Sequence, residues 1–164
     1  MDSAKYIFLV FLVAGCVLVA QGIESKRRDK PVTGVSHSIN TLGNIIHLNT
    51  YKPNAVSFTY HPIDYSVQRG VVSFGSDDYY LEALLYFDEA TFDTIKKTLK
   101  DKKARYSRAY AHEFAFDWLP QNIKDQLLDR KHLQTYDYML FQSGGLERFL
   151  LIDHAILLII RHNG

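Results

Sequence analysis

The sequence predicts an α+β domain in which two short amphipathic helices cover one face of an antiparallel sheet, preceded by a signal peptide. Runs rich in β-branched and aromatic residues lie on both sides of a central region with helical spacing, and a separate apolar run opens the chain. No internal repeat or low-complexity tract favours another architecture.

The apolar run covers residues 6–20 and follows Lys5. A helix that spans a bilayer needs about 20 apolar residues, so this shorter run is typical of the core of a cleaved signal peptide. It contains Val13-Ala14-Gly15-Cys16, the pattern that a bacterial lipoprotein signal peptidase cuts before its cysteine. We therefore expect residues 1–22 to be a signal peptide and Cys16 to be a lipidation site.

Two other fates of this segment stay open. Ordinary signal peptidase could cut after Gly22, since Ala20 and Gly22 supply the small residues it requires, and the protein would then be secreted or periplasmic. An uncleaved anchor is the third alternative, because four basic residues follow the run (Lys26, Arg27, Arg28 and Lys30) and positive flanks tend to stay cytoplasmic. The first two alternatives place the domain outside the cytoplasm.

Composition narrows the class of protein further. Cys16 is the single cysteine, so the mature chain holds no internal disulfide, and no Asn-x-Ser/Thr acceptor occurs. Both absences favour a bacterial envelope protein over a eukaryotic ectodomain. The chain carries 19 Lys plus Arg against 18 Asp plus Glu, a balance that predicts no nucleic-acid partner.

We expect residues 23–34, which are polar and contain Pro31, to be a flexible tether, and residues 35–164 to form a single α+β domain. Strand composition predicts one hairpin from residues 44–51 and 55–66 around a turn at 52–54. It predicts a second from residues 71–74 and 79–87 around a turn at 75–78.

Helical spacing follows these strands. Asp88 offers a cap for a helix over residues 89–102, in which Phe92, Ile95 and Leu99 share one face. Pro120 suits the first turn of a second helix over residues 121–130. Between the two helices, residues 106–116 carry both strand and helix signals, and the sequence does not decide between them.

The carboxyl-terminal third returns to strand patterns. Residues 135–142 alternate tyrosines with apolar residues, and Ser143-Gly144-Gly145 predicts a turn in which glycine permits positive φ. The apolar residues 148–161 form either one buried helix or two strands that bend at 153–155. We favour two strands, because paired strands in a core tolerate continuous apolar runs.

These features favour a non-enzymatic module that binds a protein or an envelope component, with no cofactor and no metal site. A tyrosine-bearing sheet face is a plausible contact surface, with Tyr136 and Tyr138 on it and Trp118 as an anchor near the second helix. A basic helix face with Lys96, Lys97 and Lys100 is a second candidate. Both groups are also ordinary for a solvated helix and for strand composition.

The alternative is a small hydrolase or metal-dependent enzyme that uses His61 and Asp64 with a second histidine, either His112 or His154. This alternative is less favoured, because the chain has neither an H-E-x-x-H nor a two-cysteine motif. It also has no G-x-S-x-G nucleophile turn, so the catalytic residues stay unknown.

Overall fold

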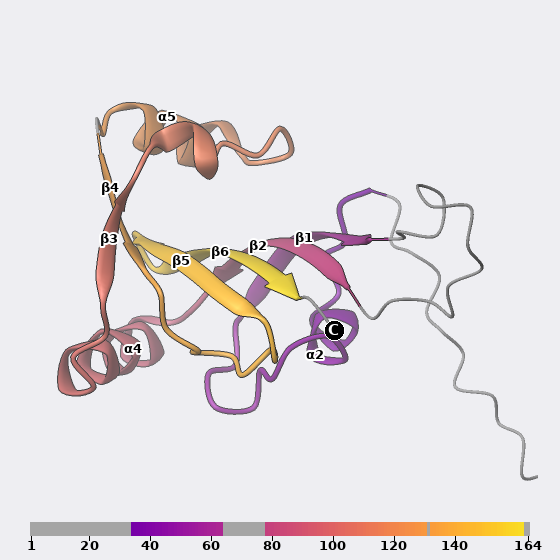
Figure 1. The fold of residues 1–164 in the computed structure, drawn as a ribbon, viewed down its shortest axis with the longest axis horizontal. Helices are drawn as coiled ribbons and strands as arrows, with labels where there is room; N and C mark the ends of the chain where they lie inside the picture. The colour runs from indigo at the N-terminus through magenta and orange to yellow at the C-terminus, as the bar shows by residue number, and fades with distance from the viewer. Residues whose placement is uncertain (1–33, 64–77, 131, 163–164) are drawn as a thin grey trace, which may run out of the picture. The chain divides into compact units, whose positions relative to one another are not determined.

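The computed structural model describes residues 34–63, 78–130 and 132–162. Their strands form one antiparallel sheet in the order β1-β2-β6-β5-β4-β3 (Figure 1). The strands are β1 (Ala55–Pro62), β2 (Tyr79–Tyr86), β3 (Tyr106–Ala109), β4 (Leu133–Tyr136), β5 (Leu146–Ile152) and β6 (Ala155–His162). The helices are α2 (Ile39–Gly43), α4 (Glu89–Asp101), α5 (Gln121–Leu128) and a short 3-10 turn, η1 (Ala111–Glu113). The predicted α+β class is therefore confirmed at the level of an antiparallel sheet with a few helices.

The chain crosses the sheet once and then returns strand by strand. It leaves β2, forms α4, and reaches β3 at the far edge of the sheet. From there β4, β5 and β6 follow as neighbours, and β6 pairs with β2. Strands far apart in the sequence thus become adjacent at the centre of the sheet.

The two predicted helices lie against opposite faces of the sheet. Three residues of α4, Phe92, Ile95 and Leu99, join the cluster that contains Leu81, Phe149 and Leu158; we call this side the first face. Two residues of α5, Ile123 and Leu127, join the cluster that contains Leu84, Leu150 and Leu157, on the second face. Figure 1 shows α4 below and α5 above the central strands. The prediction that both helices cover one face is therefore wrong, since local amphipathicity does not say which face a helix meets.

The sandwiched sheet explains the long apolar run near the carboxyl terminus. Every residue of β6 from Ala155 to Ile160 is buried, because successive side chains alternate between the two covered faces. The strands β5 and β6 join through the two residues Asp153 and His154. Asp153 adopts a φ of 48°, which aspartate tolerates better than most residues. The prediction of two strands rather than one helix is confirmed.

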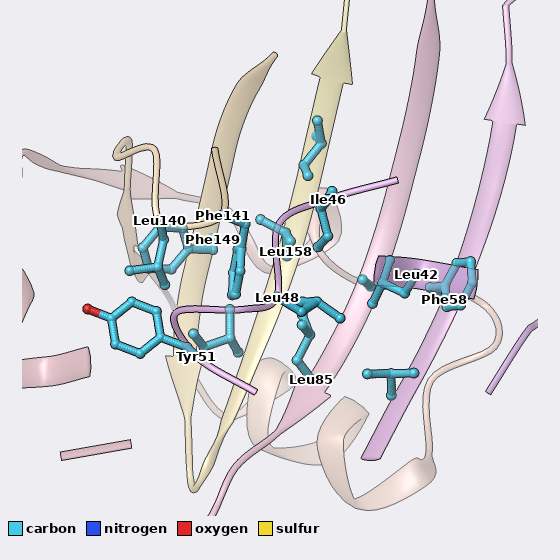
Figure 2. Close-up of a cluster of buried hydrophobic side chains, with 14 of the residues drawn as sticks. Leu42, Ile46, Leu48, Tyr51, Phe58, Leu85, Leu140, Phe141, Phe149 and Leu158 are labelled. Carbon is cyan, nitrogen blue, oxygen red and sulfur yellow. The ribbon is translucent and has the colours of Figure 1, made fainter. Parts of the chain in front are cut away.

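The segment predicted as the first strand does not enter the sheet. After α2, residues 44–54 run across the first face, and Ile46, Leu48 and Tyr51 point into its apolar cluster (Figure 2). The strand β1 pairs with β2 instead, so the predicted hairpin around residues 52–54 is wrong. Ile46 and Leu48 are two residues apart because one side of this irregular segment is buried. Apolar residues at every second position are also the pattern of a strand, so the sequence pattern resembles that of a strand.

Other local predictions are met to different extents. Asp88 caps α4 by accepting a hydrogen bond from the Thr91 backbone N–H at 2.8 Å, and α5 follows Pro120 as expected. Residues 106–116 divide into β3 and η1, and the strand expected at 135–142 is replaced by β4 at Leu133–Tyr136. Gly144 has a φ of 76° in the predicted turn. The predicted strand 71–74 and most of its turn lie outside the described residues.

A buried carboxylate fixes the loop between β4 and β5. Glu147 is 2 % exposed and accepts hydrogen bonds from the backbone N–H groups of Phe141 at 2.9 Å and Ser143 at 2.8 Å. Phe141 in turn accepts a bond from the His47 N–H through its carbonyl, at 3.0 Å. These bonds hold two irregular segments against the first face, where Leu140 and Phe141 pack beside Tyr51 (Figure 2).

Candidate functional site

The second face carries polar side chains where the apolar cluster under α5 ends. The strand register places His61, Tyr80, Arg161 and Leu146 opposite one another on β1, β2, β6 and β5. Residues opposite one another in antiparallel strands share a face, and Tyr80 packs against the cluster of the second face. We call these four residues the outer row. His61, Arg161 and Leu146 are exposed, Leu146 by 66 %.

Aromatic and cationic groups contact one another along the outer row. The Arg161 guanidinium carbon lies 5.8 Å from the centroid of the Tyr80 ring, and the His61 ring centroid lies 6.4 Å from it at an interplanar angle of 29°. Burial raises the pKa of Tyr80, and the nearby Glu82 carboxylate raises it further, while Arg161 lowers it. Tyr80 therefore stays protonated at neutral pH, and its hydroxyl forms a hydrogen bond with the Glu82 side chain.

A second row, one pleat closer to α5, holds one acidic and one basic side chain in fixed positions. This inner row consists of Thr59, Glu82, Ile159 and Arg148, again opposite one another by register. One oxygen of Glu82 accepts a hydrogen bond from the Thr59 hydroxyl at 3.1 Å and from the Trp118 indole N–H at 2.9 Å. Glu82 thus orients Trp118 beside the outer row.

Arg148 occupies the other end of the inner row. Its guanidinium lies 2.6 Å from Glu113 and 3.7 Å from Asp137. The pKa of Glu113 is lowered, first by the hydrogen bond that it accepts from the Tyr110 backbone N–H and also by the charge of Arg148. These charges are compensated within the fold, so the inner row supports the outer row and offers little free charge itself.

Arg161 differs from Arg148 in this respect. In the part of the chain that the structure describes, Arg161 contacts the Tyr80 ring but forms no ion pair. Among the described residues no carboxylate pairs with its guanidinium, whose donors suit a carboxylate or a carbonyl of another molecule. The outer row combines this cation with the Tyr80 and His61 rings and the exposed Leu146, and arginine and tyrosine are enriched at contact surfaces.

The residues predicted to bind do not form one surface. Trp118 lies at the second face, where it also stacks on Phe116 at 5.6 Å. Tyr136 stacks on Phe149 at 5.6 Å, and Tyr138 packs against the cluster of the first face. Both tyrosines are half-buried and contribute to the core.

The three lysines that were predicted to form a contact surface lie on α4, the helix that packs against the first face. Lys96 pairs with Asp93 at 2.6 Å and covers the Phe92 ring at 5.3 Å, and Lys97 lies 3.7 Å from Asp101. Lys100 is exposed in the last turn of the helix, where a positive charge complements the helix dipole. These contacts are those of a solvated helix face.

The histidines of the enzymatic alternative have separate surroundings. His61 stacks on Tyr80, His112 on Tyr110 at 5.6 Å, and His154 contacts Phe92 at 5.7 Å. Asp64 lies outside the described residues, as does Cys16. Among the residues that are described, no group of three or more His, Cys, Asp or Glu side chains could hold a metal ion.

One small pocket lies between β4 and β5. The pairing of these strands covers only Thr135 with Leu150 and Tyr136 with Phe149, and the pocket of about 160 Å³ lies beside this short ladder. Its lining consists of Arg130, Leu133, Gln134, Tyr136, Leu150 and Leu151. No carboxylate or histidine lines it, and its titratable side chains are Tyr136 and Arg130.

The register reveals residues that sequence reasoning missed. Tyr80 and Glu82 share a face by their alternation along one strand, and that signal is visible in the sequence. Arg161 and Arg148 come from other strands, and only the pairing of β2, β6 and β5 brings them to the same face.

Comparison with known protein families, curated proteins and solved structures finds no match for the chain. Within residues 34–63, 78–130 and 132–162, no helix is both long enough and apolar enough to cross a membrane.

Proposed function

We propose that this protein is an exported, non-enzymatic binding module of a bacterial cell envelope that recognises a protein or an envelope component through the outer row. One observation carries the proposal: an exposed cation and two aromatic rings lie side by side on β6, β2 and β1, next to an exposed leucine on β5. Aromatic and arginine side chains on a rigid support give large contact area at little entropic cost.

The supporting row favours recognition over catalysis. Glu82 and Arg148 lie in the inner row beside the outer row, and both are held by partners within the fold. A general base needs a free lone pair aimed at a substrate, and a nucleophile needs an adjacent base. In the part of the chain that the structure describes, the contacts of Glu82 and Arg148 place neither of them as a base beside a nucleophile.

Export is the second part of the proposal and rests on the amino-terminal sequence. Residues 1–22 act as the signal peptide, with lipidation at Cys16 as the favoured outcome and cleavage after Gly22 as the alternative. The intact mass of the protein from membrane and soluble fractions distinguishes them. A diacylglyceryl-modified chain that begins at Cys16 supports the lipoprotein, and an unprocessed chain refutes export.

Site-specific photocrosslinking in the native host tests the recognition surface. A photoreactive amino acid at His61, an exposed member of the outer row, should give a discrete crosslinked product. The same amino acid at Lys97, which is exposed on α4, serves as the control and should give none. The product should disappear when Arg161→Glu is added to the His61 variant, because the reversed charge repels an acceptor group. Equal products at both positions, or a product insensitive to Arg161→Glu, would refute the proposal.

A further inference from the structure

The opposite end of the sheet presents an open strand edge. Within the described residues, β3 pairs with β4 alone. The Asp137 N–H donates to the Arg105 carbonyl at 3.2 Å, in line with the register that pairs Tyr106 with Tyr136. Hydrogen-bonded pairs alternate along an antiparallel ladder, so Arg105, Ser107 and Ala109 direct their backbone groups toward β4. Tyr106 and Arg108 therefore direct their N–H and C=O groups outward.

Positive charge surrounds this edge. Four basic residues in and before β3 are exposed: Lys102, Lys103, Arg105 and Arg108. None of them forms an ion pair in the described part of the chain. Two acids close to them in the chain or in the ladder contact other cations, since Asp101 lies 3.7 Å from Lys97 and Asp137 lies 3.7 Å from Arg148. The edge thus carries uncompensated positive charge.

Exposed aromatic rings complete the surface. Tyr106 is 69 % exposed and Tyr110 is 59 % exposed, and they lie within and just after β3. Tyr110 also stacks on His112, whose ring lies at an interplanar angle of 13°. Tyrosines that flank an open edge provide apolar contact area to a strand that pairs there.

We propose that the β3 edge binds an extended acidic peptide segment of a partner protein, which adds to the sheet as a further strand. Main-chain hydrogen bonds to Tyr106 and Arg108 hold the peptide, and its acidic side chains pair with Arg105 and Arg108. Arg105 and Arg108 are three residues apart, an odd number, so their side chains lie on opposite faces of the strand. The peptide that fits best has acidic residues spaced three apart, since that spacing also alternates between faces.

The charge argues against a second copy of this chain as the occupant. Two β3 edges in antiparallel contact would bring the arginines of both copies together, and like charges opposite one another destabilise a strand pair. The same charges protect the free protein from edge-to-edge aggregation. This site is separate from the outer row, which lies on β1, β2, β6 and β5.

Peptide titration with the folded chain tests the proposal. The probe is a capped synthetic peptide of repeated Glu-Val-Thr units, and two control peptides accompany it. One replaces every glutamate with lysine, and the other keeps the glutamates but carries N-methyl groups on alternate backbone nitrogens. We expect the first peptide to bind and to slow hydrogen exchange at the amides of Tyr106 and Arg108. Both controls should bind at least about tenfold more weakly, since one reverses the charge attraction and the other removes the main-chain bonds.

Matched variants separate this site from general electrostatic attraction. The double variant Arg105→Glu/Arg108→Glu should weaken the acidic peptide about tenfold and favour the lysine peptide instead. The double variant Lys96→Glu/Lys97→Glu makes the same charge change on α4 and should leave the affinity nearly unchanged. No binding of the acidic peptide, equal binding of its N-methylated form, or equal effects of the two double variants would each overturn the proposal.

Discussion

The buried carboxylate of Glu147 gives the sharpest test of how the first face is assembled. Its two oxygens each accept one backbone hydrogen bond, from Phe141 at 2.9 Å and from Ser143 at 2.8 Å. In Glu147→Gln, one oxygen becomes an amide nitrogen, which is a donor and faces another donor. One backbone N–H then lacks an acceptor, and the remaining bond loses the contribution of the charge.

The magnitude follows from these two losses. An unsatisfied buried donor costs about 1–3 kcal/mol, and a bond to a charged group is stronger than a neutral one by about 1 kcal/mol. We therefore expect Glu147→Gln to lower the free energy of unfolding by about 2–4 kcal/mol. Domains of this size have urea slopes of about 1–3 kcal/mol/M. With a slope of about 2 kcal/mol/M, the midpoint should fall by roughly 1–2 M with little change in slope.

Urea unfolding followed by circular dichroism measures this shift. Glu89→Gln is the matched control, since Glu89 is exposed in the first turn of α4 and its change should stay within about 0.5 kcal/mol. Hydrogen exchange should also accelerate at the amides of Phe141 and Ser143 in the Glu147 variant. If Glu147→Gln unfolds at the same urea concentration as Glu89→Gln, the carboxylate does not hold the loop and this reasoning fails.

Three further predictions concern α4 and the second face. Phe92→Asp should unfold the domain or abolish its soluble yield, because it places an unpaired charge in the first-face cluster. The control Lys100→Asp, at an exposed position of α4, should retain wild-type thermal stability. A folded Phe92→Asp protein would contradict the packing of α4. Hydrogen bonds from Thr91 lower the pKa of Asp88, so the Asp88 carboxylate contributes stability above about pH 4, and this contribution is lost as the pH falls through the lowered pKa of the folded state. Asp88→Asn should therefore flatten this part of the stability profile in acid unfolding experiments. An unchanged profile would contradict the role of the Asp88 carboxylate. Glu82→Gln should lower the pKa of Tyr80, because the charge that raises it is removed, and an NMR titration of the ring that shows no downward shift would exclude that coupling.

Local signals in the sequence were sufficient where the responsible contacts lie within one element. Asp88 caps α4 through Thr91, three residues away, so both partners are visible in one short stretch. The turn at Gly144 and the bend at Asp153 follow the same logic, since each depends on the φ that one residue tolerates. Predictions of this kind hold without knowledge of the rest of the fold.

Local signals failed where two structures share the same period. Ile46 and Leu48 alternate as strand residues do, yet their segment crosses the first face outside the sheet. Its His47 N–H donates a hydrogen bond to the Phe141 carbonyl, in the loop between β4 and β5. One edge of β2 is occupied by another strand. That strand is β1, which pairs with β2 along its full length.

The candidate site shows the same division. The sequence placed Trp118 near the second helix, but its acceptor Glu82 lies 36 residues earlier and could not be paired with it from spacing. Tyr136 and Tyr138 have the composition of a contact surface, and the structure places them partly in the core. Whether an aromatic side chain faces solvent depends on what covers its strand, and that information is not local.

By itself the sequence determined the elements: the capped helix α4, the helix after Pro120, the turn at Gly144 and two apolar strands near the carboxyl terminus. These depend on propensity, periodicity and turn chemistry, which act over a few residues. Only the tertiary structure decided that α4 and α5 cover opposite faces, that β6 lies between β2 and β5, and that His61, Tyr80 and Arg161 form one row. Those outcomes depend on strand order and register, which are set by the burial of the whole core rather than by any one segment.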